Sequence, residues 1–213
     1  MKVRVEDPAA HRTRTHIAEV LRQRHLRCAL LTVLVTGVLC SPIVTFSPVL
    51  VREVFHGGPG QFSTAVASFG VGGLLGAGGL LAIRQTVDRR RLSSASALGC
   101  GTVLVLTGLT PWFWTLPPLL VLAGASMTVS NTAANTLLQS TVSPRLLGQT
   151  VSLYMLALRG GMSLGALLTG AAVGVVGVQR ALLLNGVLAV AAQALLARAW
   201  LRTPVPEPGP DPT

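Results

Sequence analysis

Apolar residues follow one another along this chain in long stretches, which short polar or glycine- and proline-rich segments separate. A helix of about 20 apolar residues is long enough to cross the hydrocarbon core of a bilayer. The intervening segments contain turn-forming residues, such as the Gly-Gly-Pro-Gly run at 57–60 and Gly177. The pattern therefore predicts an all-α polytopic membrane protein with six transmembrane helices, at residues 28–51, 62–83, 92–111, 116–138, 150–173 and 181–201.

The composition supports this fold class and excludes a water-soluble domain. Hydrophobic residues make up 50% of the chain and charged residues only 11%, too few to cover the surface of a soluble protein. The 23 glycines suit close packing of helices in lipid. Cys28, Cys40 and Cys100 lie in or beside apolar stretches without CxxC spacing, so we interpret them as small buried side chains, with no metal or disulfide. We expect no cofactor.

The net charge of +10 indicates orientation in a membrane. The basic residues cluster beside the apolar stretches without interleaved aromatic residues, so no nucleic-acid partner is expected. If the N-terminus is cytoplasmic, 14 of the 17 lysines and arginines lie on that side, two lie opposite, and Arg159 lies within a span. The positive-inside rule then predicts a multi-pass protein of the cell (plasma) membrane with both termini in the cytoplasm.

The two ends of the chain differ from the six-helix domain at residues 28–202. Residues 1–27 are basic and polar, so we expect no cleavable signal peptide there and expect the first span to act as the insertion signal. Within them Ile17, Val20 and Leu21 have helical spacing, which fits either a short amphipathic helix on the inner leaflet or a solvated linker. Residues 203–213 are proline-rich, and we expect a disordered cytoplasmic tail.

Arg159 is the most informative polar residue, because it lies about nine residues into the fifth apolar stretch. That is roughly 14 Å deep, near mid-membrane, where an arginine costs about 3 kcal/mol on insertion scales. Two interpretations follow: Arg159 faces a central cavity and binds an anionic group, or it snorkels or caps helix carbonyls. A counter-charge is not available within the spans, because every acidic residue lies outside them or at their edges: Glu6, Asp7, Glu19, Glu53, Asp88, Glu207 and Asp211.

A stripe of polar residues follows the fourth apolar stretch. Asn131, Asn135 and Gln139 recur every four residues, with two threonines close by, so they share one face of a helix. Such a stripe either lines a substrate path or holds helices together through hydrogen bonds. Arg159 and these three amides are the candidate substrate-binding residues.

Glycine pairs and prolines predict where helices pack closely or bend. Pro42 and Pro48 are expected to kink the first span. Three pairs with GxxxG spacing are expected to allow close contact between helices: Gly72 with Gly76, Gly161 with Gly165, and Gly170 with Gly174.

Residues 120–181 also carry a family resemblance. The segments that carry it are Asn131-Thr-Ala-Ala-Asn135-Thr-Leu-Leu-Gln139, Gly148-Gln-Thr-Val-Ser152-Leu-Tyr154 and Gly161-Met-Ser-Leu-Gly165-Ala-Leu-Leu-Thr-Gly170. They are similar to the tenth and eleventh helices of the major facilitator superfamily, in its enterobactin-exporter-like, transmembrane-secretion-effector branch. The resemblance covers about residues 15–202 and only the second of the two six-helix halves of such a transporter. Ser163 departs from the pattern, because the family often has proline there, and the glycine-rich signature loop has only a degenerate counterpart.

The resemblance implies a function in transport. It implies a secondary active transporter, or the C-terminal half of one, that exports a small organic molecule by alternating access. It also implies a second six-helix half as partner, supplied by a separate chain or by a second copy of this one. Any carboxylate that carries a coupling proton then lies in that other half, because this chain has none within its spans.

Three alternatives come from other classes of protein. A permease subunit driven by a separate ATPase fits the lack of a GxxxxGK(S/T) loop. A truncated membrane module without transport activity of its own is a second. An intramembrane hydrolase is suggested by Ser126, but all four histidines lie outside the spans, so a base at its depth is missing and we expect no enzyme.

Overall fold

Helices account for nearly all of the structure, a computed structural model that describes residues 23–82, 87–142 and 146–201. No strand occurs in these ranges, so the predicted all-α class is confirmed. The helices in chain order are α2 (Arg24–Val35), the π-helical turn η1 (Thr36–Cys40), α3 (Pro42–Glu53), α4 (Pro59–Ala82), α5 (Arg89–Leu109), the short 3₁₀ helix η2 (Phe113–Thr115), α6 (Leu116–Thr141), α7 (Leu147–Val176) and α8 (Val178–Leu201).

The described helices form six stretches that are long and apolar enough to cross a bilayer. Their bounds differ from the predicted spans by at most three residues, so the six-span prediction is confirmed. The helix expected around Ile17 and the tail at 203–213 lie outside the described residues. The six stretches are Leu26–Glu53, Pro59–Ala82, Arg89–Leu109, Phe113–Thr141, Leu147–Val176 and Val178–Trp200.

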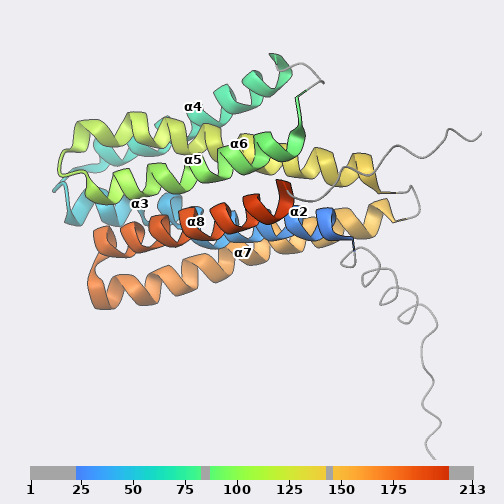
Figure 1. Ribbon diagram of the computed structural model, residues 1–213. Coiled ribbons are helices and arrows are strands. Elements are labelled where there is room, and N and C mark those ends of the chain that lie inside the picture. The colour runs from blue at the N-terminus through green and yellow to red at the C-terminus, as the bar shows by residue number, and fades with distance from the viewer. Residues whose placement is uncertain (1–22, 83–86, 143–145, 202–213) are drawn as a thin grey trace, which may run out of the picture.

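Consecutive spans run in opposite directions, so the bundle has two common ends (Figure 1). One end, on the right in Figure 1, contains the starts of α2, α5 and α7 and the ends of α4, α6 and α8. At the other end, Arg52 and Arg180 are the only arginines among the described residues. The described arginines at the first end, which we call the basic end, are Arg24, Arg27, Arg89, Arg90, Arg91 and Arg198.

The first span is irregular where α2 passes into α3. The N–H of Ser41 donates to the carbonyl of Thr36, 3.2 Å away and five residues back, so the chain makes a π-helical turn. Pro42 follows directly; it has no N–H, and its ring would clash with the carbonyl of Val38 in a regular helix. The π-helical turn thus lies directly before Pro42, whereas Pro48 lies inside α3, which continues to Glu53; the expected kinks at the two prolines stay predictions.

Two of the three predicted glycine pairs allow helices to touch. On α4, a Cβ at Gly76 would lie 2.7 Å from the carbonyl oxygen of Ala125 on α6, and Gly72 is packed as tightly against Val121. Gly161 and Gly165 of α7 face the backbone of Leu34 and Val38 in the same way. The backbones at these crossings approach too closely for any side chain.

The third pair, Gly170 with Gly174, does not make the predicted close contact. A Cβ at Gly170 would make only an ordinary contact of 3.4 Å with the ring of Phe46, and Gly174 has no neighbour within 4 Å. Gly174 is exposed near the end of α7, beyond the region where α7 crosses the first span. GxxxG spacing thus identifies a close contact only where a second helix crosses at that level.

Buried side-chain hydrogen bonds join α8 to the rest of the bundle. The Nε2 of Gln193 donates to the carbonyl of Thr32 at 3.1 Å and to the Oγ1 of Thr36 at 3.0 Å. The Nδ2 of Asn185 donates to the Oγ1 of Thr169 on α7 at 2.7 Å. Such bonds between helices stabilise a bundle by about 0.6 kcal/mol each in membranes. They were not predicted, because the sequence does not indicate which helices face each other.

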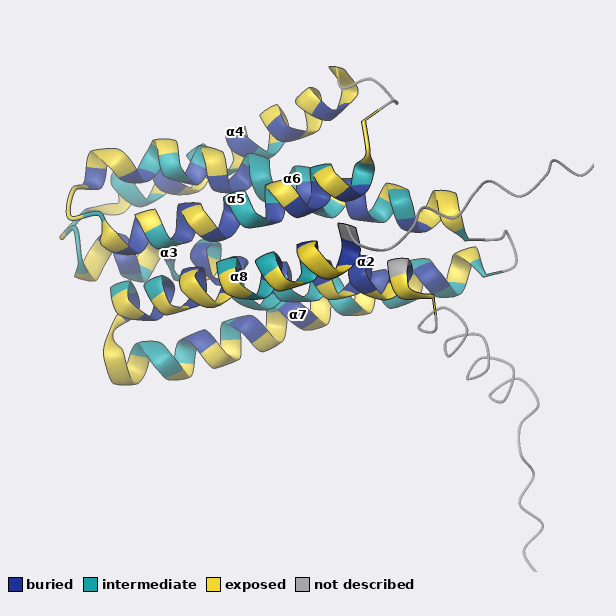
Figure 2. Ribbon diagram, viewed as in Figure 1, coloured by how far each residue is buried: buried dark blue, intermediate teal, exposed yellow. Residues whose placement is uncertain are grey.

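The outer helices leave much apolar surface uncovered (Figure 2). Only 17% of the most apolar part of α7 is buried, and 22% of that of α4, compared with 56% of the first span. Trp112 and Trp114, 71% and 78% exposed, lie at the end opposite the basic end. Tryptophans are enriched at membrane interfaces, so these two fit the position of one interface.

Candidate functional site

The polar stripe predicted on the fourth span lies on α6. The Nε2 of Gln139 donates to the Oδ1 of Asn135 at 3.0 Å, one turn away on the same helix. Asn135 is half-buried and Gln139 is exposed. This hydrogen bond lies within α6 and does not join two helices, so these two amides do not hold α6 to a neighbour through it.

Asn131 lies deeper in the bundle and has an unsatisfied acceptor. Its Oδ1 is buried without a hydrogen-bond donor among the described residues. Leaving such an acceptor unpaired costs about 1–3 kcal/mol, so a water molecule or a donor group of a ligand would be stabilised there. Asn131 is thus a polar position in the predicted stripe whose buried acceptor has no partner among the described residues.

Tyr154 of α7 contacts this region, which sequence reasoning missed. Its hydroxyl donates to the backbone carbonyl of Asn131 at 3.3 Å. One turn earlier on α7, the Oγ1 of Thr150 is fully buried and has no partner within the described residues. Tyr154 is the only tyrosine of the chain, and its place inside an apolar span was the available signal.

Arg159 lies close to the middle of α7. It is 12 residues after Leu147, about 18 Å along a helix of 30 residues. Its side chain is exposed, and it makes no hydrogen bond or ion pair with any described residue. The leucines around it are exposed too, with Leu156 at 68% and Leu167 at 71%. An unpaired guanidinium therefore lies at mid-span on an uncovered, otherwise apolar face.

The direction of Arg159 separates it from the stripe on α6. Gly161, two residues further along α7, packs on the first span. Two residues correspond to roughly 160° around a helix, so Arg159 points away from the first span. It is also roughly 140° around α7 from Tyr154, which contacts Asn131. The structure thus joins Asn135 to Gln139, while Arg159 occupies a separate surface; the binding roles of all four residues stay predictions.

Ser126 does not have the surroundings of a nucleophile. It is half-buried on α6, and its Oγ lies 3.4 Å from the position that a Cβ would take at Gly99 of α5. His56 is exposed in the turn between α3 and α4, at an end of the bundle. In the described structure, therefore, the histidine of this turn is not at the depth of Ser126.

Comparison with known proteins assigns the chain to a transporter family. Residues 15–207 match the sequence model of the family described as transmembrane secretion effector. No curated protein and no solved structure matches the chain. The matched range contains all six spans and the four predicted site residues. The chain therefore belongs to the transmembrane secretion effector family of major facilitator transporters.

Proposed function

We propose that this chain is one six-helix half of a secondary active transporter that exports a small organic molecule by alternating access. Membership of a transporter family and six apolar spans support transport in general. In such transporters two six-helix halves rock against each other around a central site. The second half is either a separate chain or a second copy of this one.

The unpaired Arg159 is the observation that carries the proposal. An arginine at mid-span costs about 2.5–3.5 kcal/mol on insertion scales, so the face of α7 that bears it is a poor surface for lipid. A second half against this face, with a water-filled path between the two, would keep the guanidinium hydrated or paired. The low burial of α7 and α4 leaves the area that such a partner requires.

The four predicted residues then have distinct roles. Arg159 provides a planar cation for a carboxylate, phosphate or sulfonate group of the substrate. Asn131, Asn135 and Gln139 supply amide donors and acceptors on α6, on a surface separate from that of Arg159. Because the one carboxylate in the described spans is Glu53, at the end of the first, a proton-coupled cycle takes its mid-membrane carboxylate from the other half.

Reconstitution at known oligomeric state tests this proposal. The chain would be placed in vesicles, alone or with a second six-helix chain, under an imposed proton gradient, with fluorescent organic anions as probes. We expect saturable transport only from two-half assemblies, because alternating access requires both halves. Saturable transport by a monomer contradicts the two-half proposal, and transport that requires ATP and an added ATPase instead of the gradient contradicts secondary transport.

A further inference from the structure

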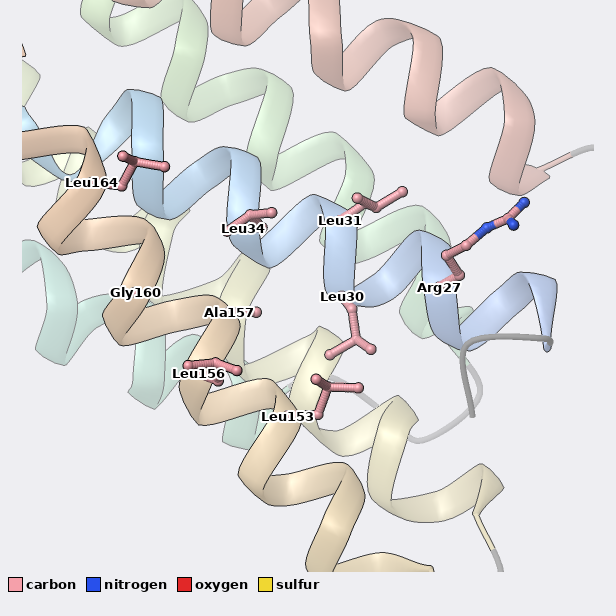
Figure 3. Close-up of a pocket in the computed structure, with 9 residues that line it drawn as sticks. All are labelled: Arg27, Leu30, Leu31, Leu34, Leu153, Leu156, Ala157, Gly160 and Leu164. Carbon is pink, nitrogen blue, oxygen red and sulfur yellow. The ribbon is translucent and has the colours of Figure 1, made fainter. Parts of the chain in front are cut away.

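A narrow apolar groove runs along the seam between α2 and α7 (Figure 3). Its volume is about 360 Å³, and it is open to the surroundings of the bundle. Gly160 lines it without a side chain, and Arg27 is the charged residue among the described residues that line it. Six leucines supply most of the wall: Leu30, Leu31 and Leu34 from α2, and Leu153, Leu156 and Leu164 from α7.

The groove has the length of one leaflet of a bilayer. From Leu153 to Leu164 the wall formed by α7 extends over 11 residues, about 16 Å along the helix axis. This is about half of the 30 Å hydrocarbon core. The groove starts at Arg27 near the basic end and reaches Leu164, close to the middle of α7. Its depth therefore matches a single acyl chain that enters from that interface.

Positive charge lies at the mouth of the groove. The side chain of Arg27 extends away from the leucines, toward the end of the bundle (Figure 3). Arg24 is exposed one turn earlier on the same face of α2. The acidic residue described at this end is Asp88, which accepts from the N–H of Arg90 at 2.9 Å and lies 3.8 Å from the guanidinium of Arg91. Among the described residues, therefore, no carboxylate pairs with the guanidinium of Arg27, which can bind an anionic head group.

We propose that this groove binds an anionic phospholipid, with one acyl chain between α2 and α7 and the phosphate at Arg27. A second copy of the chain is a poorer occupant, because two copies with the same membrane orientation would bring their Arg27 side chains together at one depth. Arg159 lies roughly 100° around α7 from Gly160. Leu156, which also lines the groove, lies one turn from Arg159. The lipid site therefore borders the face proposed for the second half, but lipid binding there does not depend on transport activity.

Native mass spectrometry of the full chain tests the head-group contact. The chain is released from micelles that contain phosphatidylglycerol or phosphatidylcholine with the same acyl chains. We expect the parent to retain the anionic lipid about fivefold better, the effect of one arginine near an anionic membrane surface. Arg27→Gln should abolish this preference. Arg198→Gln, which removes an exposed arginine at the same end but outside the groove, should keep it.

A second pair of variants tests the acyl-chain contact without endangering the fold. A Cβ at Gly160 would have only the tip of Leu156 within 4 Å, and one at Gly174 would have nothing, so both sites accept a larger side chain. Gly160→Phe should fill the groove and lower retention of both lipids at least fivefold, whereas Gly174→Phe should bind lipid like the parent. Equal retention of the two lipids by the parent, unchanged binding by Gly160→Phe, or a Gly160→Phe variant that only loses self-association would each overturn the proposal.

Discussion

At the scale of single residues, Arg159 connects the sequence to the proposed function. The side chain of Arg159 is exposed when the six described helices are considered without a second half. An arginine that only snorkels needs a route to an interface, yet Arg159 lies about 18 Å along a 30-residue helix, far from both ends. Exposure of the Arg159 guanidinium to lipid therefore costs free energy at this depth, and a position that faces a partner chain or a ligand is favoured.

Substitution of Arg159 separates these two roles. In an assembly that transports an organic anion, Arg159→Gln should insert normally but bind that anion about tenfold more weakly or worse, since a charge-assisted hydrogen bond is lost. Arg159→Lys keeps the charge without the planar fork and should restore binding only in part. Equilibrium binding to folded protein in vesicles is the measurement.

The control for this series is Arg180, an exposed arginine at the start of α8. Arg180→Gln removes the same charge at the end of the bundle and should leave the affinity unchanged. Parental affinity in Arg159→Gln would show that the mid-span arginine is structural.

At the scale of helices, packing depends on where backbones meet. Gly165 contacts the backbone of Val38, which lies in the π-helical turn η1 before Pro42. Gly174 on the same helix has no neighbour within 4 Å. Glycine spacing alone does not distinguish these two positions.

The crossing between α7 and the first span can be tested with one matched pair. Gly165→Leu should destabilise the bundle by about 1–3 kcal/mol, because the new side chain would overlap a backbone carbonyl. Gly174→Leu should be neutral or slightly stabilising, since leucine is a better helix former than glycine and has room there. Thermal unfolding in detergent, followed by helical circular dichroism, measures both. Equal unfolding midpoints would mean that the close contact does not stabilise the bundle.

The elements were predictable to different degrees, for physical reasons. The spans were correct to within three residues, because length and apolarity are local properties of the sequence. The partners of Gln193 and Asn185 could not be predicted, since hydrogen bonds over 16 to 161 positions depend on which helices pack together. For the same reason the stripe on α6 was found, whereas the contact of Tyr154 with it was not.

At the scale of the whole molecule, the separation of charge between the two ends determines how the bundle sits in a membrane. Basic side chains concentrate where α2, α5 and α7 begin, and the opposite end carries the two exposed tryptophans. Because positively charged loops stay in the cytoplasm, the basic end should face inward. The groove at Arg27 then opens toward the inner leaflet, where anionic lipids give the surface its negative potential.

Cysteine labelling in intact cells tests this orientation. Cys28, Cys40 and Cys100 are all buried, so the parent should give a low background. Gly58 is exposed in the turn before α4 and has no neighbour within 4 Å, so Gly58→Cys should react with a membrane-impermeant maleimide added outside. Arg91→Cys, at the exposed basic end, should react only after permeabilisation.

Reporter fusions provide an independent measurement of the same topology. A fusion after Thr203 should behave as cytoplasmic and one within residues 57–60 as external, because an even number of spans returns the chain to the side on which it started. The two approaches differ in what disturbs them, since a cysteine substitution changes one side chain and a reporter fusion adds a large domain. A cytoplasmic signal from residues 57–60, together with labelling of Arg91→Cys in intact cells, would mean that the bundle is inverted and that the positive-inside rule fails for this chain.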